Sequence, residues 1–271
     1  MRILTPAAAA ARVLAPVLGL MPIATASAGP ADSLVLSAAG NLPFILTAPH
    51  GGMRSIPGVT VRRNGNTLTD AGTLELTEAV AQRVGAALAG KPYVVAALFS
   101  RKYIDANRAE AEAIESLAAK PYYQAYHRQV RTFVNDVRAK FPRGALLLDI
   151  HGQAQDPDML HRGTRNGATV ATLIQRHGQE AVTGRMSVLG FLAARGYQVF
   201  PSGPQMANPA EDRRFSGGYT VATYGSNHAD GIDAIQIELG KTIRANPALA
   251  DDLAAAIVVF ARRYLLARSA R

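Results

Sequence analysis

The stretch that most constrains the fold of this chain is Leu146–Gln153, which reads LLLDIHGQ. Three large apolar residues in a row are typical of a strand that is buried on both faces. The stretch turns polar at its carboxyl end, and ligands of open α/β sheets gather beyond the carboxyl ends of the strands. His151 is therefore a candidate metal ligand or base. A single histidine in such a place is more often structural, so the case for chemistry depends on other strand ends.

Three other predicted strands also end in polar residues. His50 follows an apolar run at 44–47 and lies in the sequence PHGG, whose glycines permit close approach of the backbone to a ligand. The third run, 93–99, is followed by Ser-Arg-Lys-Tyr-Ile-Asp-Ala-Asn-Arg. The fourth, 234–240, places Gln236 and Glu238 on one face by alternation and its aliphatic residues on the other. A carboxylate in such a strand indicates either a solvated edge or a functional cavity.

The polar segment that follows residue 99 contains two arginines, Arg101 and Arg108, with Asp105 and Asn107 between them. Arginine presents a planar fork of donors that suits carboxylates, and Asp105 would orient one of the two guanidinium groups. This composition favours a site for an anionic ligand. A cluster of surface salt bridges is the alternative interpretation.

Helical periodicity alternates with these strands along the chain. The pattern predicts helices at 72–88, 109–139 (divided near Pro121), 169–176, 181–196 and 247–267. Short strands are predicted at 34–36, 198–201 and 220–223, and polar loops at 156–167 and 206–218. Strands alternating with helices predict an α/β domain. We find no internal repeat, linker or second domain in the sequence.

The amino terminus predicts export. A short basic start, an apolar segment from Ala7 to Ala24 and Ala26-Ser27-Ala28 resemble a secretory signal peptide at residues 1–28. An uncleaved membrane anchor is the alternative, but Arg12 and two prolines interrupt the segment. Cleavage after residue 28 would leave residues 29–271, enough for one catalytic domain with a proper core. We therefore expect a periplasmic or secreted protein with no stable membrane insertion after cleavage.

Composition narrows the possible chemistry. The chain has no cysteine, which excludes a thiolate zinc site, a cysteine nucleophile and disulfides. Its formal net charge of +9 falls to +7 without the two arginines of the predicted signal peptide. These charges are scattered, so nucleic-acid binding has little support, whereas anionic substrates or an anionic envelope suit them. The motifs HExxH, GxSxG and the P-loop are absent.

Two histidines and one carboxylate on separate strand ends would form an open zinc site. The carboxylate is a choice between Asp70, which precedes the helix at 72–88, and Glu75 within it. Asp70 has an equal alternative role as the N-cap of that helix. A further carboxylate would act as general base, and arginines would hold a substrate carboxylate and face an oxyanion. If the four loops converge, the set predicts metal-assisted hydrolysis of an amide with an acidic end.

The order of these motifs resembles the N-formylglutamate amidohydrolase family over essentially the whole chain after residue 28. The segments are PHGG (49–52), TD (69–70), SRxxxDxNR (100–108), LDIHG (148–152), FSGGY (215–219) and QxE (236–238). The resemblance implies a three-layer α/β/α fold around a mixed, largely parallel sheet, similar to zinc carboxypeptidases and phosphorylase/hydrolase-like folds. It also implies one Zn²⁺ ion and hydrolysis of an N-acyl amino acid by an activated water.

The resemblance also implies a role for individual residues. His50 and His151 would bind zinc, with Asp70 as third ligand, although carboxypeptidases take a glutamate three residues after their first histidine, where this chain has Met53. Glu238 would be the general base and Arg101 would face the oxyanion. The substrate carboxylate would lie against three residues: Asn107, Arg108 and, more loosely, Tyr219.

Export departs from the cytoplasmic location expected of a histidine-breakdown enzyme, so other N-acyl amino acids or short envelope peptides are open as substrates. An exported peptidoglycan amidase or carboxypeptidase is the second interpretation, because cell-wall amidases share the glycine-flanked first histidine. A non-catalytic binder of carboxylate ligands is the third. Metal content separates it from the other two, since a pure binder need not retain zinc.

Overall fold

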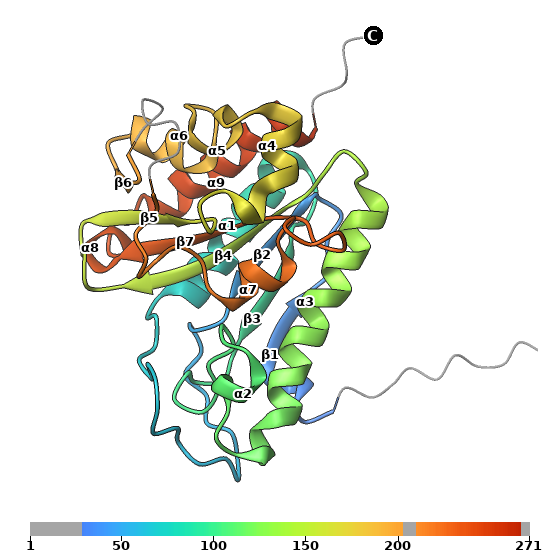
Figure 1. Ribbon diagram of the computed structural model, residues 1–271, viewed down its shortest axis with the longest axis vertical. Coiled ribbons are helices and arrows are strands. Elements are labelled where there is room, and N and C mark those ends of the chain that lie inside the picture. Colours follow the sequence, from blue (N-terminus) through green and yellow to red (C-terminus); the bar gives the residue numbers. More distant parts are fainter. Residues whose placement is uncertain (1–28, 203–209, 267–271) are drawn as a thin grey trace, which may run out of the picture.

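The computed structural model describes residues 29–202 and 210–266, and the predicted signal peptide lies outside them. Seven strands form one mixed sheet in the order β1-β3-β2-β4-β7-β5-β6 (Figure 1). The four central strands β3, β2, β4 and β7 are parallel, whereas β1 and the pair β5–β6 run in the opposite direction. The strands are β1 (Val35–Ala38), β2 (Phe44–Ala48), β3 (Tyr93–Ala97), β4 (Leu146–Gln153), β5 (Met159–Gly163), β6 (Gln198–Phe200) and β7 (Asp233–Gly240).

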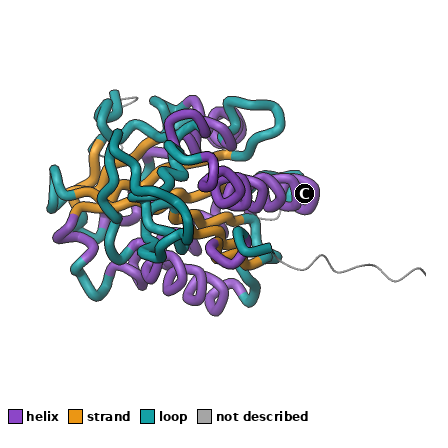
Figure 2. Tube along the Cα trace, turned by 90° about the horizontal axis from the view of Figure 1, so that it is seen from below, coloured by secondary structure: helices purple, strands orange, loops and turns teal. Residues whose placement is uncertain are grey.

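Helices cover both faces of the sheet, as Figure 2 shows, which confirms the predicted three-layer α/β/α fold. One face packs against the helices α1, α9 and α4 to α6, and the other against α3 and α7. The helices are α1 (Thr73–Leu88), α2 (Glu110–Ala113), α3 (Lys120–Lys140), α4 (Ala171–His177), α5 (Glu180–Thr183), α6 (Val188–Ala194), α7 (Tyr219–Tyr224), α8 (Lys241–Arg244) and α9 (Leu249–Phe260). Shorter turns of helix lie at η1 (Asp32–Leu34), η2 (Leu117–Ala119), η3 (Ala168–Val170) and η4 (Ala261–Leu265).

Alternation along the central strands divides the core from the polar residues. In β4, Leu146, Leu148 and Ile150 join the core under α1 and α9, and in β7 the three aliphatic residues 235, 237 and 239 do the same. The intervening residues face the α3 and α7 side, where β4 and β7 pair His151 with Glu238 and Asp149 with Gln236. The predicted alternation of β7 is therefore confirmed, and the polar residues of both strands share one face of the sheet.

Two segments differ from the sequence prediction. Residues 220–223 were expected to form a strand because they read TVAT, but they belong to helix α7, whose Val221 and Tyr224 are buried in the core beneath α3. Tertiary packing at helical spacing overrides the β-propensity of these residues. The predicted loop at 156–167 contains strand β5, which pairs antiparallel with β7. Its polar side chains concealed it, because His161 and Arg162 are buried and paired rather than solvated.

The remaining elements agree in type with the prediction, but the predicted helix at 181–196 is divided into α5 and α6, and α8 was not predicted. The predicted helix at 109–139 is divided as expected, and α3 begins at Lys120 with Pro121 in its first turn, where proline is tolerated. Residues 206–209 of the predicted loop and Ala267 of the predicted last helix lie outside the described residues. In the described ranges, no helix combines the length and the hydropathy needed to cross a bilayer.

Candidate functional site

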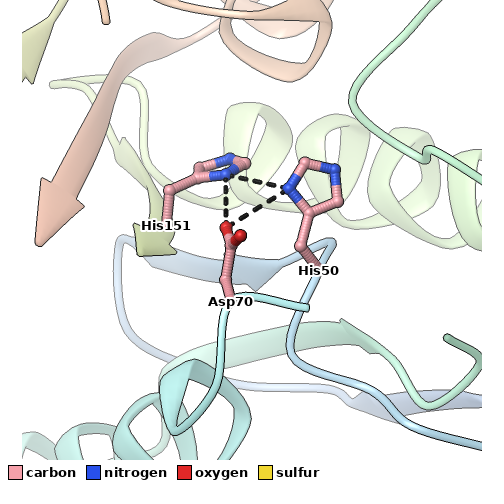
Figure 3. A group of neighbouring side chains, drawn as sticks. All are labelled: His50, Asp70 and His151. Atoms are coloured by element: carbon pink, nitrogen blue, oxygen red, sulfur yellow. Dashed lines mark hydrogen bonds and ion pairs between the residues drawn. The ribbon is translucent and has the colours of Figure 1, made fainter. Parts of the chain in front are cut away.

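Three side chains from three segments meet at the carboxyl edge of the sheet (Figure 3). His151 belongs to β4, His50 follows β2, and Asp70 precedes α1. The Nδ1 atoms of the two histidines lie 3.2 Å apart, and Oδ2 of Asp70 lies 3.3 Å from one and 3.2 Å from the other. All three residues are buried. The sequence prediction that these strand ends converge is thus realised in the structure.

The backbone around the histidines explains this placement. The amide of Asp70 donates to the carbonyl of His50, which links the segment before α1 to the end of β2. Gly52 permits the close approach of the loop to β3, since an added Cβ would lie 2.4 Å from the carbonyl oxygen of Ala97. The glycines of PHGG therefore allow this loop to lie close against neighbouring backbone.

The N-cap interpretation of Asp70 is wrong. The residue that caps α1 is Gly72, and no side chain accepts a hydrogen bond at that helix end. The carboxylate of Asp70 instead contacts both histidines, accepts from the amide of Gly152 and lies 3.5 Å from the guanidinium of Arg101. Glu75, the alternative ligand, is exposed on α1 and is not part of the cluster.

Each histidine has a carboxylate on its other ring nitrogen. Nε2 of His151 lies 2.8 Å from Asp149, and Nε2 of His50 lies 2.7 Å from Asp105. Carboxylate acceptors keep the ring proton on Nε2 and leave the Nδ1 lone pairs facing each other and Asp70. Three lone-pair donors at such distances repel one another unless a proton or a metal ion lies between them.

The donor set fits zinc. Zinc is bound by imidazole nitrogen and carboxylate oxygen at about 2.0–2.1 Å, so two ligands of a tetrahedral ion are about 3.3 Å apart. The three distances in this cluster, from 3.2 to 3.3 Å, match that separation. Asp149 and Asp105 supply the outer carboxylates that commonly orient zinc-binding histidines. From the sequence, Asp105 was expected only as a partner of arginine, and Asp149 had no predicted role.

The cluster strongly perturbs the pKa values of its members. Burial alone would raise the pKa of Asp70, but His50 and His151 lower it well below its usual range. Burial alone would lower the pKa of His151, but Asp149 and Asp70 raise it well above its ordinary value. Both shifts have the same origin. A negative carboxylate stabilises the protonated form of a neighbouring imidazole, and a protonated imidazole stabilises the ionised form of a neighbouring carboxylate.

Glu238 lies beside this cluster, with its carboxylate 4.0 Å from Nδ1 of His151. Burial raises the pKa of Glu238, and the side-chain amide of Gln236 donates to its carboxylate at 2.7 Å. A buried carboxylate with a raised pKa, oriented by an amide and facing a cavity, has the properties of a general base.

The predicted anion clamp is only partly available. Arg101 is buried and forms a two-donor ion pair with Asp105. The amide of Asn107 contacts His151 and Gln236, and its oxygen accepts from the amide of Thr220 at the start of α7. Both side chains therefore have partners within the protein.

Two other predicted residues lie at different distances from the cavity. The Arg108 side chain is exposed at its edge, with one contact to the carbonyl of Asn107. Tyr219 does not line the cavity, and its ring packs edge-on against His127 at 5.4 Å.

The cluster opens into a cavity of about 530 Å³, within the range of small-molecule sites. Sequence reasoning missed several of its lining residues, including Arg213, Arg214 and Arg244. Arg244 donates to the backbone carbonyls of Ala71, Gln153 and Leu239. It follows the end of β7, like the residues that were predicted from strand ends, so the same signal could have identified it. The cavity lining is basic and suits an anionic ligand.

Comparisons with known proteins bear on the family and on the fold. Residues 115–243 match the sequence model of the N-formylglutamate amidohydrolase family. A crystal structure of N-formylglutamate amidohydrolase from Ralstonia eutropha JMP134 is similar with a TM-score of 0.56 and 19% identity, over 85% of this chain and 98% of that one. A gene product of Agrobacterium tumefaciens is similar with a TM-score of 0.52 and 17% identity, over 84% and 90% of the two chains. These likenesses show the fold. No curated protein sequence matches the chain.

Proposed function

We propose that this chain is a member of the N-formylglutamate amidohydrolase family, whose sequence model matches residues 115–243, and that it is an exported zinc-dependent amidohydrolase. The substrate is a small N-acyl amino acid, or a related small amide, that carries a carboxylate. The observation that carries the proposal is the meeting of His50, Asp70 and His151 with Glu238 in one basic cavity. The net charge and the apolar amino terminus support the location and the anionic substrate.

A zinc ion held by the two histidines and Asp70 would supply Lewis acidity and a water of lowered pKa. The protein residues then divide the remaining work. Glu238 accepts the proton of the attacking water and later returns it to the leaving nitrogen. Burial raises the pKa of Glu238, which makes its carboxylate a stronger proton acceptor than an exposed one.

Arg108 is the best placed of the predicted residues to bind the substrate carboxylate, since its guanidinium is at the cavity edge and is not ion-paired among the described residues. Asn107 contributes by holding His151, Gln236 and the start of α7 in position. Arg101 is 3.5 Å from Asp70 and ion-paired to Asp105, so it fixes the charge balance of the cluster from one side.

The first experiment is metal analysis of the purified protein beginning at residue 29, paired with an amine-release assay. The assay uses N-formyl-L-glutamate, N-acetyl-L-glutamate and a peptidoglycan digest in parallel. We expect about one equivalent of zinc at this cluster and release of amine from a small N-acyl substrate. Zinc with activity only on the digest would move the assignment to an envelope amidase, and absence of both would leave a carboxylate binder.

The matched variants are His151→Ala and Glu75→Gln. The first removes a ligand and should abolish zinc at the cluster together with activity. The second changes the exposed alternative carboxylate and should change neither. Equal zinc retention in both variants would contradict the proposed site. Localisation is tested by expressing the full chain and by determining the amino terminus of the recovered protein, which should begin at Gly29.

A further inference from the structure

A second group of metal-binding side chains lies beside the cavity. Asp156 precedes β5, His161 is in β5, and Asp212 lies in the loop before α7. The ligand atoms of these three side chains all lie within 4.8 Å of one another. Nε2 of His161 is 2.9 Å from Oδ2 of Asp156. His161 pairs with Glu238 across β5 and β7, and β7 separates β5 from strand β4, which carries His151 of the first cluster.

His161 is the observation that points to a ligand. The residue is 2% exposed, and although Nε2 is close enough to Asp156 for an ion pair, neither ring nitrogen makes a hydrogen bond of good geometry within the described ranges. Buried polar atoms nearly always have a hydrogen-bond partner, and one that lacks it requires an explanation such as an ion or a water. Burial lowers the pKa of His161 despite the opposing effect of Asp156, which favours the neutral imidazole that binds metals.

One cation already lies at these carboxylates. Arg214 contacts Asp156 at 2.8 Å and binds Asp212 through Nε, while its side chain is 49% exposed. The two carboxylates thus attract positive charge, and the guanidinium has room to move into solvent. No hydrogen bond from Arg214 or from another described donor satisfies the lone pair of the His161 imidazole.

We propose that Asp156, His161 and Asp212 form a second divalent-cation site, which takes Zn²⁺ or a similar ion by displacing the guanidinium of Arg214. One imidazole and two carboxylates make a mixed nitrogen and oxygen donor set of the kind that such borderline cations accept. Two negative charges match the ion once Arg214 has left. The guanidinium is then released at the cavity that it also lines. This site is independent of the proposed amide hydrolysis.

The test is zinc stoichiometry by equilibrium dialysis and mass spectrometry, with affinity from calorimetry. The wild type should bind two equivalents of Zn²⁺, and His151→Ala should keep the one bound at the second site. Asp212→Asn in the His151→Ala background should lose that equivalent. Asp212 is partly exposed, so this variant is the safest for folding, and an unchanged thermal unfolding curve checks it.

Arg214→Gln provides a variant with the opposite expected effect. Removing the competing guanidinium should lower the Kd for Zn²⁺ in the His151→Ala background, whereas loss of a ligand raises it. The proposal is overturned if His151→Ala binds no Zn²⁺, if Asp212→Asn keeps its equivalent, or if Arg214→Gln binds no more tightly than its parent. A wild type with a single equivalent that survives His151→Ala would support this site and contradict the first one.

Discussion

Asp149→Asn tests how the outer carboxylate prepares His151 for metal. Asp149 is fully buried, with one oxygen 2.8 Å from Nε2 of His151 and the other accepting from the Thr47 hydroxyl at 2.6 Å. Asparagine has the same shape and keeps an oxygen that can accept from the imidazole, while its amide faces the Thr47 oxygen. The substitution therefore removes charge with little change of geometry.

Loss of such an outer partner typically weakens metal binding by about 10- to 100-fold, which is about 1.4–2.7 kcal/mol of binding free energy. We expect the variant to fall in this range because no solvent screens the buried carboxylate. The assay is competition for Zn²⁺ against a chromophoric chelator, at one pH and ionic strength. The second cluster should bind a Zn²⁺ ion of its own, so the titration of the wild type should have two phases. The phase that is lost in His151→Ala belongs to the first cluster.

Asp136→Asn is the matched control. Asp136 is a partly exposed carboxylate that binds Tyr93 and Lys140 and contacts neither histidine. It should leave zinc affinity unchanged. An Asp149→Asn affinity within twofold of the wild type, in a protein with native circular dichroism, would refute the idea that this carboxylate sets the donor strength of His151.

Three further predictions concern turnover and packing. Glu238→Gln should keep zinc and lower kcat by about 10²- to 10⁴-fold, the usual contribution of a general base, and unchanged kcat would remove Glu238 from the mechanism. Arg108→Ala should raise KM for a carboxylate substrate with a smaller change in kcat, and an unaltered KM in steady-state kinetics would exclude the clamp. Gly218→Ala places a Cβ 2.3 Å from the buried amide of Asn107, so urea denaturation should show a loss of about 1–3 kcal/mol in unfolding free energy; wild-type stability would mean that this contact relaxes freely.

The fold was predictable where the sequence pattern and the burial agree. The LLLDIHGQ stretch is the central strand β4, and the alternation of β7 places Glu238 on the site face as expected. Strand β5 and helix α7 were mispredicted because their residue types reflect tertiary partners. His161 and Arg162 are polar yet buried, and the β-branched residues of α7 are held by core packing that no local pattern encodes.

The site was predictable to the extent that strand ends mark it. The parallel central strands bring their carboxyl ends to one edge, so His50, His151 and Glu238 were accessible from the pattern alone. The orientation of each side chain was not, since it depends on hydrogen bonds across the fold. Arg101, for example, lines the cavity, but the sequence could not show how its buried ion pair with Asp105 orients the guanidinium.

The contact between His50 and His151 also has a topological consequence. It joins points that are 101 residues apart in a chain without cysteine, and the Asp70 contact closes a further loop of 20 residues. A covalent link that closes a loop of about 100 residues raises the free energy of the unfolded chain by about 4.7 kcal/mol, because it lowers the conformational entropy of that chain. An ion shared by these ligands would act as a reversible staple of the same span. The resistance of the protein to proteases would then depend on the zinc supply of the compartment that it inhabits.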